Sequence, residues 1–164
     1  MIRIGFGYDV HRLTAGLPLI LGGVHIPGDM GLKGHSDADV LAHAVIDSML
    51  GALALGDIGT HFPDNDPAYA GCNSMNLLEK VSDMVLSRNW IVGNLDTTIC
   101  AQTPRLAPFI DQMRLNLARA VKTRIENVSV KATTTEGLGF TGRAEGICSY
   151  AVVSLLNVAR NEDT

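Results

Sequence analysis

The side chains best suited to acid–base or metal chemistry are concentrated in one stretch, Gly34–Gly59. Within it, Asp39, His43 and Asp47 recur every fourth residue, a spacing that places side chains along one side of a helix. Most positions between them are apolar, as expected for a helix that packs on a sheet. A line of acid, imidazole and acid beside so much apolar surface indicates a metal ligand or a phosphate site at the edge of a cleft.

Two further candidate ligands, Asp9 and His11, stand near the start of the chain. Residues 1–8 alternate between apolar and small or polar side chains and predict a strand that ends beside this pair. Residues two apart in an extended chain project to the same side, so Asp9 and His11 are expected to point together. With His43 they offer one carboxylate and two imidazoles, which suit zinc with an open fourth position. Taken alone, the pair also fits a solvated strand end.

Three threonines and a glutamate, Thr133–Glu136, stand at the end of a further predicted strand, residues 128–134. Hydroxyls and backbone N–H groups in such a place can hold phosphate oxygens. Glu136 could bind a hard cation such as Mg²⁺, which usually bridges substrate phosphates. The preference of threonine for strands is the alternative explanation of the run.

An acidic loop, Asp57–Pro67, leaves the predicted helix that carries His43 and holds three further acids and a histidine among turn-forming residues. It is therefore expected to border the same site. A loop that covers a substrate and an acidic surface loop are both compatible with this composition, and the residues alone leave the two alternatives open.

The helix that positions these groups has recognisable ends. Ser36 and Asp39 have the spacing of a capping box, with Asp in place of the usual Glu. We therefore expect the helix to run from Asp37 to Leu55, with Gly56 as a left-handed cap.

The other elements predict an α/β (α+β) fold with about four main strands in a mixed sheet, helices on one face and a small hairpin. We expect a single domain over residues 1–158, followed by a polar C-terminal tail over residues 159–164. There are too few helices to cover both faces of the sheet, and a homo-oligomer that packs sheet faces together is one solution. The remaining elements are a hairpin over residues 17–26 with a Gly22-Gly23 turn, helices over 73–88 and 106–122, and strands over 90–100, 128–134 and 146–158.

Composition excludes several classes of function. Of the 164 residues, 46% are hydrophobic and 18% are charged, enough to build a core. The formal net charge of -4 and the absence of a basic run argue against a nucleic-acid partner. No apolar segment reaches the roughly 18 residues of a membrane span, and Met1 leads directly into a strand-like pattern, so no membrane partner is expected. Three scattered cysteines fit reduced side chains in a cytoplasmic protein.

Several blocks of residues, in order and at matching spacing, resemble the 2-C-methyl-D-erythritol 2,4-cyclodiphosphate synthase family of the non-mevalonate isoprenoid pathway. Taken together, these blocks extend over nearly the whole chain, to about Val158. The full set is far more specific than any single block. The blocks are Gly7–His11, His35–Asp37, Asp39–Val40 with His43, Gly51, Leu55–Gly59, Phe62–Pro67, Val130–Glu136 and Gly139–Arg143.

The resemblance implies a role for each candidate residue. It implies zinc ligands at Asp9, His11 and His43, transition-state stabilisers at His35 and Thr134, a phosphate contact at Ser36, and a diphosphate site with Mg²⁺ or Mn²⁺ at Thr133, Thr135 and Glu136. It implies methylerythritol contacts at Asp57, Ile58, Gly59, Phe62, Pro63, Asp64, Asn65 and Asp66, and a cytidine pocket at Ala101, Gln102, Thr103, Pro104, Arg105, Leu106 and Ala107. It implies that Phe140 and Arg143 border a three-fold cavity where isoprenoid diphosphates bind.

The resemblance also implies a reaction and an assembly. The 2-phosphate of 4-diphosphocytidyl-2-C-methyl-D-erythritol 2-phosphate would attack the β-phosphorus of the same molecule and release CMP, in active sites between the subunits of a homotrimer. The family often has Lys where this chain has Arg105, and a larger apolar residue where it has Ala107, which affects the detail of the pocket. A zinc-dependent phosphohydrolase and a non-catalytic isoprenoid-diphosphate-binding trimer are the alternatives.

Overall fold

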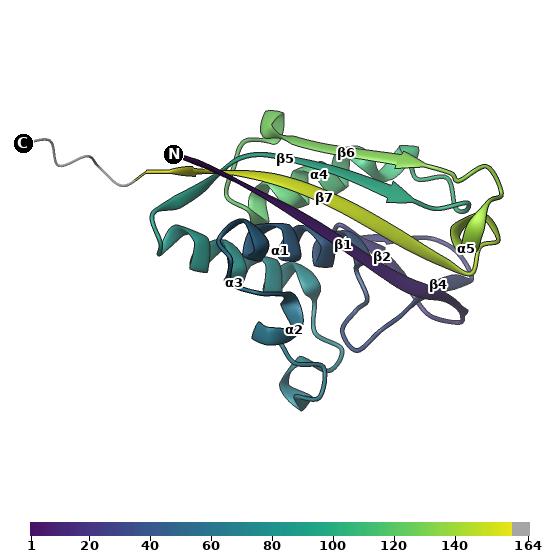
Figure 1. Ribbon diagram of the computed structural model, residues 1–164. Coiled ribbons are helices and arrows are strands. Elements are labelled where there is room, and N and C mark those ends of the chain that lie inside the picture. Colours follow the sequence, from purple (N-terminus) through teal and green to yellow (C-terminus); the bar gives the residue numbers. More distant parts are fainter. Residues whose placement is uncertain (159–164) are drawn as a thin grey trace, which may run out of the picture.

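A mixed sheet forms the centre of the molecule, as seen in a computed structural model that describes residues 1–158 (Figure 1). Within these residues the sheet has five strands in the order β4-β1-β7-β5-β6, and β2 and β3 form a separate hairpin. The predicted α+β fold with a mixed sheet and a small hairpin is therefore confirmed. The predicted tail, residues 159–164, lies outside the described residues.

The strands are β1 (Ile2–Ala15), β2 (Leu19–Leu21), β3 (Val24–Ile26), β4 (Met30–Lys33), β5 (Trp90–Cys100), β6 (Val128–Thr133) and β7 (Gly146–Asn157). The α-helices are α1 (Val40–Ala52), α2 (Ile58–His61), α3 (Ser74–Leu86), α4 (Ile110–Ala120) and α5 (Gly139–Gly142). Short 3₁₀ turns cover Pro67–Tyr69, Ala107–Phe109 and Ile125–Asn127. Strand β7 pairs antiparallel with both β1 and β5, whereas β5 and β6 are parallel and are joined through α4.

Strand β1 is longer than predicted, because pairing with β7 continues to Arg12 and pairing with β4 continues to Ala15. Asp9 and His11 therefore lie inside a strand rather than beyond its end. The short strand β4 was not among the predicted elements, so the prediction of about four main strands was one too few. Strand β4 is too short to show a periodic pattern, and Gly31 within it and Gly34 directly after it are more typical of a loop.

The central helix is shorter than predicted at both ends. Asp39 is the N-cap, and its carboxylate accepts hydrogen bonds from the backbone N–H groups of Leu41 and Ala42. At the other end, the N–H of Leu55 bonds back to the Leu50 carbonyl while Ala54 adopts φ 56°, which closes the helix before Gly56. The capping-box and Gly56 predictions were therefore wrong, although the helix itself was correctly placed.

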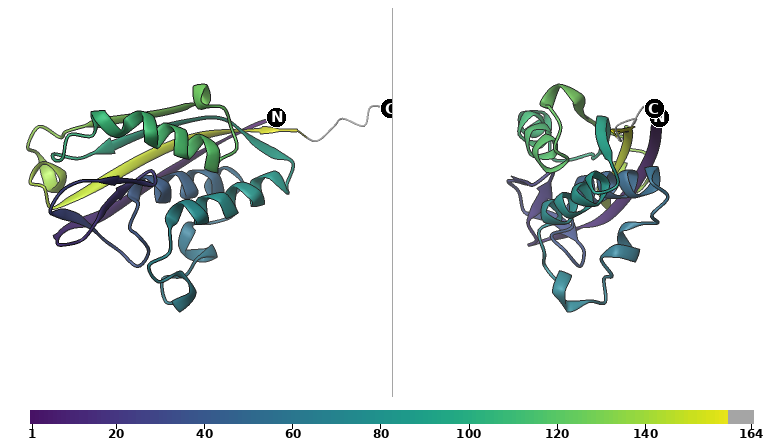
Figure 2. Two further views of the ribbon diagram at one scale, coloured as in Figure 1. Left: turned by 180° about the vertical axis from the view of Figure 1, so that it is seen from behind. Right: turned by 90° about the vertical axis from the view of Figure 1, so that its left-hand side faces the viewer.

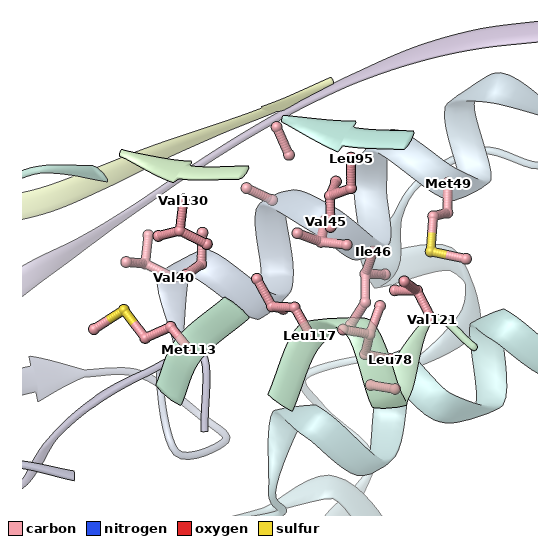
Figure 3. Close-up of a cluster of buried hydrophobic side chains, with 14 of the residues drawn as sticks. Val40, Val45, Ile46, Met49, Leu78, Leu95, Met113, Leu117, Val121 and Val130 are labelled. Atoms are coloured by element: carbon pink, nitrogen blue, oxygen red, sulfur yellow. The ribbon is translucent and has the colours of Figure 1, made fainter. Parts of the chain in front are cut away.

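Helices α1, α3 and α4 pack on one face of the main sheet (Figure 2). Between them lies the hydrophobic core, in which side chains of α1 such as Ile46 and Met49 meet Leu78 of α3 and Leu117 of α4 (Figure 3). Each fully buried side chain of this size contributes roughly 1.5–3 kcal/mol of transfer free energy. No helix in the described part of the chain has both the length and the apolar character needed to cross a membrane.

The opposite face of the sheet is apolar and exposed. In β1 the even-numbered side chains point away from the helices, and Phe6 is 62% exposed there. Neighbouring β7 continues this surface, since Phe6 is paired with Val152 and Tyr8 with Tyr150. The exposed apolar side chains on these two strands are Ile2, Ile4, Phe6, Tyr8, Val10, Tyr150, Val152 and Leu156. Monomeric proteins rarely leave so large a contiguous apolar surface in water.

Helix α1 approaches β1 very closely at two glycines. A β-carbon on Gly5 would stand 1.8 Å from the Ser48 carbonyl oxygen, and one on Gly7 would stand 1.9 Å from the Ala44 carbonyl oxygen. Real β-carbons do not approach backbone oxygen so closely, so only glycine permits this contact.

We expect Gly7→Ala to lower the free energy of unfolding by about 3 kcal/mol or more, because the added methyl group must push α1 away from the sheet. The measurement is equilibrium denaturation. Gly28→Ala is the matched control, since its β-carbon would meet no atom within 4 Å and its φ is not positive. Its unfolding free energy should change by less than about 1 kcal/mol. Equal stability of the two variants would contradict the close approach.

Candidate active site

Asp9, His11 and His43 converge on one point, as the sequence predicted. The Oδ2 atom of Asp9 lies 3.1 Å from Nε2 of His11 and 2.9 Å from Nδ1 of His43, and the two nitrogens are 3.2 Å apart. These three atoms form a nearly equilateral triangle. Asp9 and His11 come from β1, on the face that looks toward the helices, and His43 comes from α1, which packs against that face.

The remaining nitrogens of the two imidazoles have their own partners. Nδ1 of His11 lies 3.0 Å from the Lys33 carbonyl oxygen, to which it can donate only as N–H. Its Nε2 is thereby left as the free lone pair at the triangle. Nε2 of His43 lies 2.8 Å from the Ser74 hydroxyl, and its Nδ1 faces the triangle. Both rings thus present one nitrogen inward and hold the other with a hydrogen bond.

The carboxylate of the triangle is kept ionised by its neighbours. Burial by itself would raise the pKa of Asp9, but the hydrogen bonds that His11 and His43 donate to it when their rings are protonated, together with their charge, outweigh burial and hold this pKa well below its usual range. Burial likewise works to lower the pKa of His11, but the hydrogen bond and charge of Asp9 outweigh it and raise the pKa. A permanent negative charge between two imidazoles is an environment that attracts a cation.

The triangle has the dimensions of a metal site. In a tetrahedral zinc site with bonds of about 2.0 Å, ligand atoms stand about 3.3 Å from one another, close to the separations seen here. The chain offers three such ligands at this point, which leaves a fourth position open, as in catalytic rather than structural zinc sites. The donor set and its spacing therefore fit a divalent metal ion.

A cavity of about 340 Å³ opens onto the triangle. The structure gathers around it many residues that the sequence singled out, from four separate segments. Those residues are Asp9, His11, His35, Ser36, His43, Ile58, Gly59, Phe62 and Asp64. Tyr69, Cys72 and Leu77 also line the cavity and were not predicted. Tyr69 and Cys72 follow the acidic loop, and an apolar or aromatic residue in a turn-rich segment is the only sequence signal that could have indicated them.

The acidic loop borders this cavity, as predicted. Ile58 and Gly59 line it, and the N–H of Ile58 donates to the Asp47 carboxylate of α1 at 2.8 Å. Asp57 turns away to cap the short helix α2 through Thr60. Pro63, Asn65 and Asp66 belong to the same loop but do not line the cavity, although the Asp66 carbonyl oxygen lies 3.4 Å from the His35 ring.

A second cavity, of about 520 Å³, contains the whole predicted pocket segment. It is lined by Ala101, Gln102, Thr103, Pro104, Arg105, Leu106 and Ala107, with Ile110, Ala132, Thr133 and Thr134. The parallel strands β5 and β6 end side by side here, which explains why residues about 30 apart in sequence meet. The two cavities have no lining residue in common.

The predicted residues Thr135, Glu136, Phe140 and Arg143 do not line either cavity. The Thr134 hydroxyl donates to the Glu136 carboxylate at 3.1 Å, while the Thr135 hydroxyl donates to the Leu138 carbonyl. Phe140 lies in α5, and Arg143, which follows it, pairs with Glu145 at 2.7 Å. These two residues are not among those that line either cavity in the described part of the chain.

The polar line on α1 has three different uses. His43 belongs to the triangle and Asp47 holds the acidic loop. Asp39 is fully buried and accepts hydrogen bonds from the N–H groups of Gly22 and Gly23, in the hairpin turn, at 2.9 and 2.7 Å. The even spacing predicted one shared line, but Asp39 is the N-cap of α1, has a structural task and is not part of the cluster.

Comparison with known proteins agrees with this geometry. The sequence profile of the YgbB family matches residues 2–156. The chain belongs to the YgbB family. A relative from Desulfitobacterium hafniense, a 2-C-methyl-D-erythritol 2,4-cyclodiphosphate synthase, is 62% identical over 158 residues, covering 96% of this chain and 100% of the relative. Because relatives this similar along their whole length are such synthases, this YgbB-family chain is an enzyme of that kind, and the resemblance is confirmed.

Solved structures of the YgbB family share the fold. The bifunctional IspDF from Campylobacter jejuni aligns with a TM-score of 0.92 and 43% identity, covering 98% of this chain and 44% of that one. A CDP complex of IspF from Plasmodium falciparum aligns with a TM-score of 0.84 and 33% identity, covering 96% of this chain and 97% of that one.

We expect His43→Ala to lower the affinity of this YgbB-family chain for Zn²⁺ by more than the roughly 100-fold seen when a metal ligand loses an outer partner. Competition with a chelating dye measures the affinity. His25→Ala is the matched control, because His25 is exposed on the hairpin and belongs to neither cavity. Retained tight binding in His43→Ala, or an equal loss in His25→Ala, would show that the triangle is not the metal site.

Proposed function

We propose that the chain converts 4-diphosphocytidyl-2-C-methyl-D-erythritol 2-phosphate into 2-C-methyl-D-erythritol 2,4-cyclodiphosphate and CMP. The observation that carries the proposal is the triangle of Asp9, His11 and His43 at the floor of one cavity. A second cavity, lined by hydroxyls and backbone at the ends of two strands, suits a nucleotide. The substrate would need both places, because its two reacting phosphates are attached to carbons 2 and 4 of the methylerythritol, whereas its cytidine lies beyond them at the far end of the molecule.

The proposed metal is zinc, since one carboxylate and two imidazoles with an open position are a zinc-type donor set. Bound there, zinc would hold and polarise the β-phosphate of the substrate. Glu136 would hold a Mg²⁺ or Mn²⁺ ion on the cytidine diphosphate, a role in keeping with its exposed carboxylate beside the Thr134 hydroxyl.

The other residues of the first cavity would bind and orient the substrate. His35 and Ser36, which line this cavity, would contact a substrate phosphate, and Ile58, Gly59 and Asp64 would contact the methylerythritol. In the second cavity Thr133 and Thr134 would contact the diphosphate, while Ala101–Ala107 would surround the cytidine. No protein nucleophile is needed, because positioning two ends of one molecule can supply an effective molarity of roughly 10⁵ M or more.

We further propose that the active site is shared between subunits of a homotrimer. Two observations support this: the two cavities have no lining residue in common, and the exposed apolar face of β1 and β7 requires a cover. Packing these faces around a three-fold axis would bury them. The metal cavity of one subunit would then meet the nucleotide cavity of its neighbour, with Phe140 and Arg143 bordering the central space.

Product analysis tests the reaction. With zinc and Mg²⁺ present, phosphorus NMR should show the cyclic diphosphate and CMP in equal amounts without inorganic phosphate. Removing metal with a chelator should abolish CMP release, and restoring zinc with Mg²⁺ should recover it. Release of inorganic phosphate would instead indicate a phosphohydrolase, and unaltered turnover in the metal-free protein would reject the role of the metal.

Mixing two inactive variants tests the shared site. His43→Ala damages the metal cavity, and Ala107→Trp fills the nucleotide cavity from an exposed position. After co-refolding at equal amounts, random trimers should recover roughly a quarter of the wild-type activity, because one site in each mixed trimer has two intact halves. Each variant alone should stay inactive. No recovery in mixed trimers would place the whole site within one subunit.

A further inference from the structure

The outer nitrogen of His43 belongs to a chain of buried and partly buried polar groups. Nε2 of His43 lies 2.8 Å from the Ser74 hydroxyl oxygen. The same hydroxyl is in close contact with the Oδ1 atom of Asp37, and the backbone N–H of Ser74 donates to Oδ2 of Asp37 at 3.1 Å. Ser74 is fully buried at the first turn of α3. Three residues from three segments thus form one line that ends at the metal triangle.

Hydrogen-bond chemistry gives this line a direction. An ionised carboxylate can only accept, so the single hydroxyl proton of Ser74 must point to Asp37. The lone pairs of Ser74 then accept a hydrogen bond from His43, which requires the proton of the neutral imidazole to be on Nε2. The other nitrogen, Nδ1, is consequently left with a free lone pair at the triangle, 2.9 Å from Asp9.

A second hydroxyl competes for His43. The Ser36 oxygen lies 3.1 Å from Nε2 of His43 and 3.2 Å from the Ser74 oxygen. Ser36 also lines the cavity, so it is the hydroxyl that can turn toward a ligand. Ser74 is fully buried, and the Asp37 carboxylate accepts hydrogen bonds from both its hydroxyl and its backbone N–H. The inner hydroxyl can therefore keep the imidazole in place when the outer one is engaged elsewhere.

We propose that Ser74 and Asp37 are positioning residues that fix the tautomer and orientation of His43 for metal binding, and that they leave Ser36 free for the substrate. The inference rests on the metal site of the proposed function. It assigns a task to Asp37 and Ser74, which are neither ligands of the triangle nor lining residues of the cavity. Loss of such an outer partner typically lowers metal affinity 10–100-fold.

The experiment measures Zn²⁺ affinity of the full-length, metal-free protein by competition with a chelating dye at one fixed pH. We expect Ser74→Ala and Asp37→Asn each to lower the affinity by roughly 10–100-fold. The double variant should lose about as much as Ser74→Ala alone, because the two residues act in series. Ser82→Ala is the matched control: it removes another buried hydroxyl from the same helix, and its affinity should stay unchanged.

Thermal unfolding of the metal-free proteins separates positioning from a merely structural role. A lower melting temperature in Ser74→Ala and Asp37→Asn with zinc affinity equal to wild type would overturn the proposal. Additive losses in the double variant would also overturn it. If Ser74→Ala fails to fold, the zinc affinity of Asp37→Asn, which keeps the shape of the side chain, is sufficient to test the proposal. Absence of zinc binding by the wild-type protein would reject the proposed metal itself, whereas normal wild-type binding with no loss in these variants would reject only the positioning role.

Discussion

The arrangement of the whole site depends on the close contact between helix α1 and strand β1. Gly5 and Gly7 offer no side chain to the helix, so its backbone lies nearer to the sheet than any other residue would allow. That closeness brings His43 within hydrogen-bonding distance of Asp9, and it sets the separation of the ligand atoms. The ligands therefore stand on two regular elements whose spacing is fixed by backbone packing, which holds a site more firmly than loops do.

Local periodicity was enough to predict the convergence of the three ligands. A period of two put Asp9 and His11 on one side of a strand, and a period of four put His43 in line with its acidic neighbours on a helix. Both rules depend only on the geometry of the element in which a residue stands, so an error of several residues in the end of β1 did not disturb the result. The mixed sheet and the hairpin followed from similarly local patterns.

What sequence reasoning missed depends on contacts between distant segments. Strand β4 exists because the edge of β1 is available to it, and Ala54 ends α1 because its backbone can close the last turn there. Neither the pairing of β4 nor the end of α1 at Ala54 can be read from the types of the residues alone. The hydrogen bond between Ser74 and Asp37 joins residues from different elements. Tyr69 likewise lines the cavity beside residues that are distant from it in the sequence. Periodicity predicts the side of an element but not which segment will lie across it.

The carboxylate of Asp39 has a further consequence for local opening. It holds the first turn of α1 through Oδ1, and it holds the Gly22-Gly23 turn of the hairpin through both oxygens. If the hairpin detached, this buried charge would lose half of its donors, which is costly in an apolar interior. The hairpin and the start of α1 should therefore exchange their amide hydrogens as one cooperative unit, and the segment that bears His43 gains protection from a turn that contributes nothing to its chemistry.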